Sequence, residues 1–338
     1  MSESNKRNFI VHGSILAIAG ILVRIIGMLY RIPVVNIIGS EGNGIYGVAF
    51  NIYNIMLVLS SYGLPMAVSK LVSARFTKKR YKSAAKVLRC SLMVAVCTGG
   101  IAALLVFFGA SFIENVIYGG GLPGLAVPLR ILAPTIFLVA ILGVIRGFFQ
   151  GQSTMIPTAV SQILEQIVNA IVSIAAGYGM MKAFASLPDV AAYGAAGSTL
   201  GTAMGALTAV LFMGFLYAVY TPTFNRLKRK DRHTENQSTG QICKIIIYTM
   251  IPIILGQTFY QISALIDDVM FSNIMVGRDI TKSISMDLGN FSSSYSLLIG
   301  IPQGVASAMS ASMLPSVVAS FTDRDYAVSY THLTLPTK

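Results

Sequence analysis

The sequence contains no tryptophan, and it is poor in charge, above all in acidic residues. Of its 338 residues, 13 are aspartate or glutamate and 25 are lysine or arginine, so charged residues account for 11% of the chain. A soluble globular domain carries about 25% charged residues. Because 54% of the residues are hydrophobic and the mean hydropathy is +0.69, the composition excludes an ordinary soluble domain and predicts an integral membrane protein.

Cysteine and histidine are also scarce, with three residues of each. Cys90, Cys97 and Cys243 have neither the spacing of a zinc site nor that of a disulfide framework. We expect them to lie in or near membrane helices as small apolar residues. The histidines show no metal-ligand spacing either. The sequence therefore predicts no metal centre and no cofactor.

The excess of basic residues gives a net charge of +12, which taken alone would suggest a nucleic-acid partner. The charge is concentrated between apolar runs, mainly in residues 75–89 and 226–244, with Lys6, Arg7 and Arg146, the last assigned to the turn after the fourth span. The positive-inside rule places such segments on the cytoplasmic side, where they also meet anionic lipid headgroups. We therefore predict no nucleic-acid partner, and a multi-pass plasma-membrane protein with a cytoplasmic N-terminus.

Apolar runs of about 20 residues, the length that crosses a bilayer, occur eight times along the chain. The predicted fold class is therefore all-α: a polytopic membrane protein with about eight transmembrane helices. The predicted spans cover about residues 9–35, 45–72, 87–117, 125–149, 156–181, 193–220, 245–276 and 288–318.

The long polar and basic segment at residues 221–244 separates two groups of spans. We expect residues 1–220 to form a first lobe of six helices and residues 221–244 to be a flexible cytoplasmic linker. Residues 245–320 then supply the first two helices of a second lobe. For the cytoplasmic tail, 321–338, two interpretations stay open: sequence foreign to the protein, or a short native tail.

Small residues recur at intervals of four in the sixth span, at Gly197, Gly201 and Gly205. This small-xxx-small spacing places all three glycines on one helix face. Because glycine lets two backbones approach closely, the pattern predicts a tightly packed helix pair in the membrane.

Two arginines lie inside otherwise apolar sequence in the first span. Arg24 and Arg31 are seven residues apart, about two helical turns, so both project from roughly the same face. A charged side chain within a membrane is costly and usually faces a bundle interior or an aqueous cavity. A planar guanidinium binds phosphate oxygens through paired hydrogen bonds, so the pair predicts a diphosphate site. The alternative is that these arginines reach the lipid headgroups, which suits Arg31 better.

The fifth span carries Gln162, Glu165, Gln166 and Asn169 at helical spacing on one stripe. One interpretation is a polar wall that binds substrate, with Glu165 available for sugar hydroxyls, an arginine or a proton. The other is a polar seam that holds helices together. The sequence leaves both interpretations open.

Two aspartates, Asp267 and Asp268, lie near the end of the seventh span. Adjacent residues point to different faces of a helix, so they are not expected to act as a catalytic pair. One of them is a candidate site for a coupling cation, Na⁺ or H⁺. The alternative is that both lie in water at the helix end, because polar sequence follows shortly after them.

Helix breaks are predicted at Gly63 and Pro65 in the second span and at Pro302 in the eighth. Proline removes a backbone donor and bends a helix, and the freed backbone groups can line a cavity. We interpret these positions as candidate gating hinges. Proline is frequent in membrane helices, so this indication is weak on its own.

Five segments of the sequence resemble one family of membrane proteins. They read RIIGMLYRIPVV (24–35), IGSEGNGIYGVAFNIYNIMLVLSSYGLPMAVSKLV (38–72), RGFFQGQSTMIPTAVSQILEQIVN (146–169), PIILGQTFYQISALIDD (252–268) and IPQGVASAMSASMLPSVV (301–318). These segments resemble the polysaccharide-export and lipid-linked oligosaccharide flippases of the multidrug/oligosaccharidyl-lipid/polysaccharide exporter superfamily. Within that family they are most similar to stage V sporulation protein B and the lipid II flippases.

The resemblance implies two lobes of about six helices that rock around a central site. It implies transport of a polyprenyl-diphosphate-linked saccharide, a peptidoglycan precursor or a polysaccharide unit, with the first-helix arginines holding the diphosphate. It extends to about residue 326, so we expect a C-terminally truncated second lobe. Some lipid II flippases carry a further arginine in the eighth span, and Leu297 stands at that position here.

Three other functions are considered beside the flippase. A cation-coupled multidrug antiporter of the same superfamily would need an acidic cavity, which two first-span arginines disfavour. A membrane enzyme would need larger outer loops with catalytic acids or bases, so the sequence predicts no enzyme. A non-transporting membrane protein of envelope or spore assembly stays open. The expected partners of the flippase are a lipid-linked saccharide, the bilayer and a coupling cation.

Overall fold

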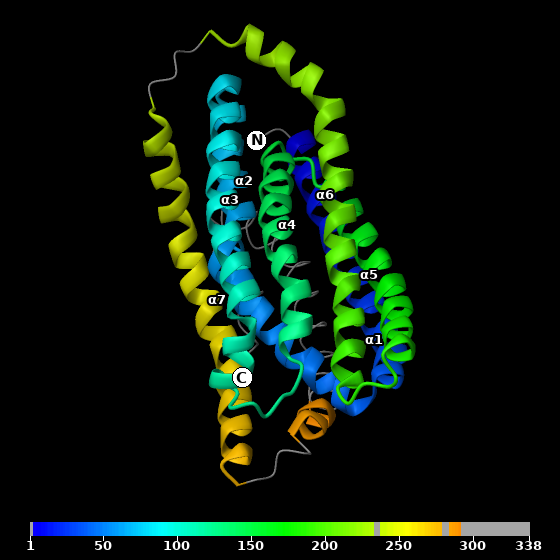
Figure 1. Ribbon diagram of the computed structural model, residues 1–338. Coiled ribbons are helices and arrows are strands. Elements are labelled where there is room, and N and C mark those ends of the chain that lie inside the picture. Colours follow the sequence, from blue (N-terminus) through cyan, green and yellow to red (C-terminus); the bar gives the residue numbers. More distant parts are fainter. Residues whose placement is uncertain (1–2, 233–236, 279–283, 292–338) are drawn as a thin grey trace, which may run out of the picture.

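In the computed structural model, residues 3–232, 237–278 and 284–291 are described, and every regular element among them is helical (Figure 1). The elements are α1 (Glu3–Ser60), α2 (Leu64–Thr77), α3 (Tyr81–Phe112), the π-helix η1 (Ile113–Ile117), α4 (Ala126–Gly151), α5 (Ile156–Ala183), α6 (Val190–Lys230) and α7 (Thr239–Val276). A further helical segment covers residues 284–291. The all-α fold class is thereby confirmed.

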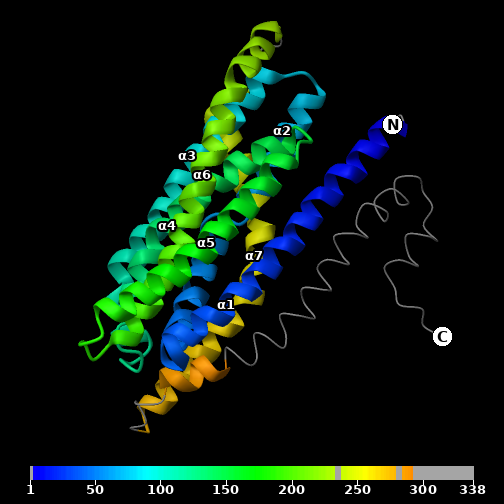
Figure 2. The same cartoon turned by 90° about the vertical axis from the view of Figure 1, so that its right-hand side faces the viewer.

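The first helix is bent sharply at Gly39, which divides α1 into two limbs. Gly39 has φ 69° and ψ 177°, a conformation essentially confined to glycine. The first limb, residues 3–38, runs from the end marked N, and the second limb, residues 40–60, runs back beside it (Figures 1 and 2). The sequence predicts a tight turn over residues 39–44, and the structure narrows it to Gly39, because helix continues from residue 40.

Replacing Gly39 by alanine is expected to destabilise the protein by about 1–3 kcal/mol, since a Cβ atom is strained at this φ and ψ. The space around that Cβ is open, with no atom within 4 Å, so backbone strain alone produces the effect. The matched control is Gly20→Ala in the first limb, where the space is also open and φ is ordinary. Thermal unfolding in detergent measures both variants, and equal midpoints for the two would contradict the prediction.

Six helical stretches among the described residues are long and apolar enough to cross a membrane. The first, Ile18–Thr77, holds 60 residues, about 90 Å of helix at 1.5 Å per residue, so its two limbs correspond to two crossings. When the two limbs of the first stretch are counted separately, the six stretches correspond to seven of the eight predicted spans. The eighth, 288–318, falls almost wholly outside the described residues, as do Leu297, Pro302 and the tail 321–338.

The glycine pattern of α6 packs against α5, as the sequence predicts. A Cβ atom on Gly205 would lie 2.6 Å from the Glu165 carbonyl oxygen, and one on Gly201 would lie 2.6 Å from the Ser173 amide nitrogen. Such distances are shorter than van der Waals contact, so only glycine allows these two backbones to meet. The close packing of α6 against one face of α5 therefore holds α5 rigidly in place, together with the side chains on its other face.

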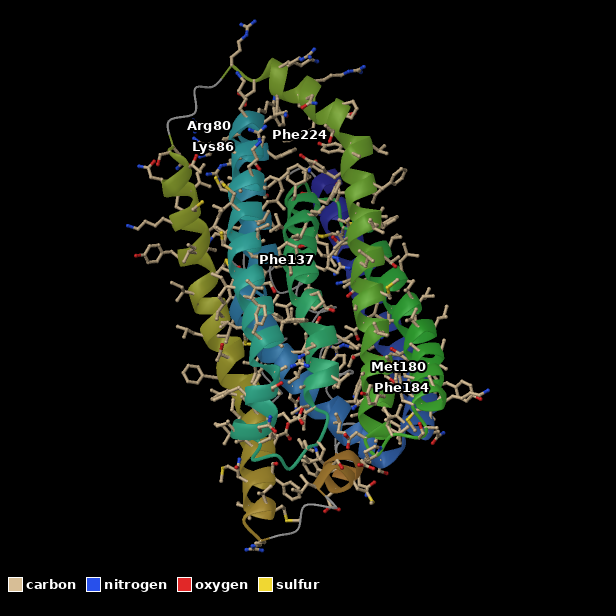
Figure 3. The ribbon with its side chains drawn as sticks, viewed as in Figure 1. Arg80, Lys86, Phe137, Met180, Phe184 and Phe224 are labelled. Carbon is tan, nitrogen blue, oxygen red and sulfur yellow. The ribbon has the colours of Figure 1, made fainter. Side chains whose placement is uncertain are left out.

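The basic segments gather at one end of the bundle, the end that also carries the N-terminus (Figures 1 and 2). Arg80 and Lys86 lie there near the start of α3, close to Phe224 of α6 in the view of Figure 3. Beneath them, aromatic rings pack tightly, and the Phe224 ring stacks on Phe76 with centroids 6.0 Å apart. One end of the molecule is thus strongly basic, which is the charge asymmetry that the positive-inside rule describes.

The α6–α7 junction differs from the flexible linker predicted over residues 221–244. Helix α6 continues to Lys230, because extending an existing helix through lysines and arginines costs little. Asp231 then ends it, and its Oδ2 accepts a hydrogen bond from the Lys82 amide at 2.8 Å, at the first turn of α3. Helix α7 starts at Thr239 with a capping box formed by Ser238 and Gln241.

Candidate functional site

The two arginines of the first span lie on the first limb of α1, two turns apart. Arg24 is exposed and Arg31 is half-buried. The Arg31 guanidinium lies over the ring of Tyr46, 5.9 Å from its centroid. Tyr46 belongs to the second limb, so this cation–π contact links the two limbs of α1 across the bend at Gly39.

Helix α5 runs alongside the first limb and parallel to it (Figure 2). A Cβ atom on Gly27 would lie 3.3 Å from the Gln166 Nε2. One turn further along both helices, the Asn169 Nδ2 donates a hydrogen bond to the Tyr30 hydroxyl at 3.3 Å. Two parallel helices advance by the same rise per residue, so positions one turn earlier on each also lie side by side. Arg24, about one turn before Gly27, therefore lies at the level of Gln162.

Asn169 joins three helices through its amide. Besides the bond to Tyr30 of α1, its Oδ1 accepts hydrogen bonds from the Ser173 hydroxyl at 2.9 Å and the Thr202 hydroxyl of α6 at 3.4 Å. The residue is 8% exposed. These contacts hold the polar stripe of α5 at a fixed height against α1.

The structure adds one residue to this region that the sequence assigns elsewhere, namely Arg146. From the sequence, its charge is counted with the cytoplasmic turn at the end of the predicted fourth span, 125–149, whereas in the structure it lies inside α4, which ends at Gly151. Its Nη2 forms an ion pair with Glu165 Oε2 at 2.7 Å, and its Nε donates to the Ser161 hydroxyl at 2.9 Å. The two charged side chains are only 13% and 25% exposed. Glu165 is therefore bound by an arginine, one of the partners considered for it.

A signal for this pair exists in the sequence. Arg146 and Ser161 stand at equal distances on either side of the α4–α5 turn near residues 153–154. In an antiparallel helical hairpin such positions lie at the same height, and Glu165 lies one turn further along. Knowing which way each side chain points would still have required the structure.

Gln162 brings a buried acceptor to the same stripe. Its Oε1 is buried, and within the part of the chain that the structure describes it has no hydrogen-bond partner. An unsatisfied buried carbonyl costs about 1–3 kcal/mol, so this oxygen favours a donor from a bound molecule. We call Arg24, Arg31, Gln162, Gln166 and Asn169 the α1–α5 polar strip.

The other predicted site residues lie apart from this strip. Asp267 is exposed, whereas Asp268 is half-buried and its Oδ2 accepts a hydrogen bond from the Asn51 Nδ2 at 2.7 Å. The helix break at residues 61–63 separates α1 from α2, and Pro65 lies in the first turn of α2. Gly63 lies against α7, since a Cβ on it would be 3.0 Å from the Met250 Cβ.

A kinked first helix, apolar helices of bilayer length and a polar strip within them define a multi-pass helical membrane protein. The fold agrees: an outward-facing multidrug resistance MATE family transporter of the MOP superfamily superposes with a TM-score of 0.64 at 16% identity. That match covers 96% of this chain and 68% of the transporter chain. The chain belongs to the polysaccharide biosynthesis protein family, which matches residues 10–321.

Two relatives from Bacillus subtilis (strain 168) are similar over most of the sequence. The lipid II flippase MurJ is 28% identical over 320 residues, and stage V sporulation protein B is 26% identical over 315 residues. Each alignment covers 92% of this chain and 58% of the relative. The chain thus spans somewhat more than half the length of these relatives, and the family predicted from the sequence motifs is confirmed.

Proposed function

We propose that the protein, in its full length, is a flippase that moves a polyprenyl-diphosphate-linked saccharide across the plasma membrane. The observation that carries this proposal is the α1–α5 polar strip, in which two cationic side chains of one membrane helix lie beside the amides of another. The names of the two Bacillus subtilis relatives support it, one being a lipid II flippase and the other a sporulation protein.

Arg24 and Arg31 would hold the diphosphate through paired, charge-assisted hydrogen bonds. The contact of the Arg31 guanidinium with the Tyr46 ring would help to hold it in position for this role. Gln162 and Gln166 would receive the sugar, because amides both donate to and accept from hydroxyl groups. Asn169, whose amide is engaged by three helices, would set the position of the strip.

Transport would follow alternating access, with the N-terminus and the basic end in the cytoplasm and two lobes rocking around the bound lipid. The break at Gly63 and the turn at Pro65 would serve as hinges. Asp267 or Asp268 would bind the coupling cation, Na⁺ or H⁺, since a carboxylate beside the Asn51 amide supplies the oxygen ligands that hard cations prefer.

Binding of undecaprenyl-diphosphate sugar to the full-length protein tests this function. Arg24→Ala and Arg31→Ala are each expected to weaken binding by about 2 kcal/mol, the value of a lost charge-assisted contact. The control is Arg130→Ala on α4, whose exposed guanidinium donates to Ser111 at 2.8 Å and lies outside the strip. Unchanged affinity in both strip variants would contradict a diphosphate site there.

The similarity of the fold to a MATE transporter favours a second candidate, a cation-coupled multidrug antiporter. Such a protein binds cationic drugs, which the charges of Arg24 and Arg31 would repel. The same binding assay with an organic cation in place of the lipid separates the two. Saturable binding of the cation that improves in Arg24→Ala would favour the antiporter.

A further inference from the structure

Cys90 and Cys243 lie together at the basic end of the molecule, although 153 positions separate them in the sequence. Cys90 is on α3 and Cys243 is on α7, and these helices lie side by side (Figure 1). The two thiols lie close enough to interact with each other. The Cys90 Sγ also lies 3.9 Å from the Thr239 carbonyl oxygen, one helical turn before Cys243. Because residues four apart lie on the same helix face, the contact at Thr239 holds the Cys90 side chain against the face of α7 that carries Cys243.

The surroundings keep this contact in place. Cys90 belongs to an apolar cluster with Ile242, Ile246 and Met250 of α7, and Cys243 packs at its edge. Cys90 is 1% exposed, whereas Cys243 is half-buried. A small reagent therefore reaches Cys243 first and finds Cys90 behind it. The third cysteine, Cys97, is exposed on α3.

We propose that Cys90 and Cys243 form a reversible oxidation site, with a peroxide as the oxidant. Cys243 attacks the peroxide O–O bond, becomes a sulfenic acid and releases water in the case of hydrogen peroxide. The Cys90 sulfur then attacks the Cys243 sulfur, the S–O bond breaks, and a second water leaves as the disulfide forms. Two thiols lose two electrons and two protons, and one peroxide is reduced to two waters.

The disulfide would tie the α1–α6 bundle to α7, the first helix after the α6–α7 junction. This consequence rests on the proposed function, because in alternating access the helices on either side of that junction move against each other. A covalent bond across α3 and α7 then stops the cycle in one state. Thiol reductants restore both sulfhydryls and with them the motion.

The test uses the full-length protein in liposomes, treated with hydrogen peroxide and mapped by mass spectrometry of proteolytic peptides. A Cys90–Cys243 linked peptide is expected in the wild type and in Cys97→Ser, with loss of lipid transport that dithiothreitol reverses. Cys90→Ser and Cys243→Ser are expected to keep their transport under peroxide. Cysteine-to-serine changes are small, and transport by the untreated variants shows that they fold.

Two results would overturn the proposal. Sulfenic acid on Cys243 without the linked peptide would show that the two thiols do not meet. A linked peptide without loss of transport would show that the disulfide does not restrict the motion of the helices. Peptide mapping needs no transport, so it judges the disulfide even if the untreated wild type moves no lipid. An untreated wild type without lipid transport would count against the proposed flippase function, and the linked peptide would still decide whether the oxidation site exists.

Discussion

Replacing Arg146 by alanine is expected to destabilise the protein by about 2–4 kcal/mol, because it leaves the Glu165 carboxylate buried without its partner. Removing one member of a fully buried ion pair costs about 3–5 kcal/mol. The side chains of this pair are 13% and 25% exposed, and solvent screens partly exposed charges, so the expected cost lies somewhat below that range. Ser161 also loses the Arg146 Nε as a hydrogen-bond donor. Unfolding in detergent, followed by circular dichroism, measures the change.

Arg130→Ala is the matched control, since Arg130 lies on the same helix but is exposed and donates a hydrogen bond to the Ser111 hydroxyl instead of pairing with a buried carboxylate. Its effect is expected to stay within about 0.5 kcal/mol, as for most surface substitutions. Glu165→Gln combined with Arg146→Ala closes a double-mutant cycle. The double variant is expected to be more stable than Arg146→Ala alone, because no unpaired charge is left buried. Strict additivity of the two substitutions would refute the ion pair as a stabilising unit.

Replacing Gly201 by valine is the second change with a large expected effect. The new Cβ would lie 2.6 Å from the Ser173 amide nitrogen and 2.5 Å from the Asn169 carbonyl oxygen. Both are backbone atoms, so helices α5 and α6 must separate. Overpacking of this kind costs about 1–3 kcal/mol, and occasionally more. Because Asn169 lies at the contact, its hydrogen bonds to Tyr30 and Thr202 are expected to weaken as well.

Gly214→Val provides the comparison for this substitution, since Gly214 lies on the same helix with open space around its Cβ. Both variants add the same side chain to α6 and carry the same change in helix propensity. The difference between their unfolding midpoints therefore isolates the contact with α5. If Gly214→Val destabilises as much as Gly201→Val, the close approach of the two helices is not what limits stability.

Composition and hydropathy were sufficient for the helical class and for most span positions, because a bilayer demands long apolar helices whatever their partners. Helix α5, predicted over 156–181, covers Ile156–Ala183. The predicted sixth span ends at residue 220, ten residues before α6 ends. Hydropathy marks the end of an apolar run, but the helix continues as long as its backbone hydrogen bonds do. The structure supplies that end at Lys230, followed by Asp231.

The candidate site could be predicted only in part. Arg24, Arg31 and the stripe of α5 are visible in the sequence because their periodicity and polarity contrast with apolar neighbours. The bond between Asn51 and Asp268 joins residues 217 positions apart, and no local pattern carries such information. The ion pair of Arg146 was missed for a related reason. A charge near a turn suggests a cytoplasmic loop, and its buried partner Glu165 lies on the next helix.

The parallel alignment of α5 with the first limb of α1 also has a consequence for biosynthesis. Tyr30 and Asn169 meet although 139 positions separate them, and at about 5–20 residues per second the ribosome takes roughly 7–28 seconds to cover that interval. During this time the arginine-bearing limb is in the translocon or the bilayer without its partner. An arginine at the centre of an inserting helix costs about 2.5–3.5 kcal/mol. Insertion must therefore be driven by neighbouring apolar side chains, among them Leu22, Ile25 and Leu29, before helix α5 is available to pack beside the arginine-bearing limb.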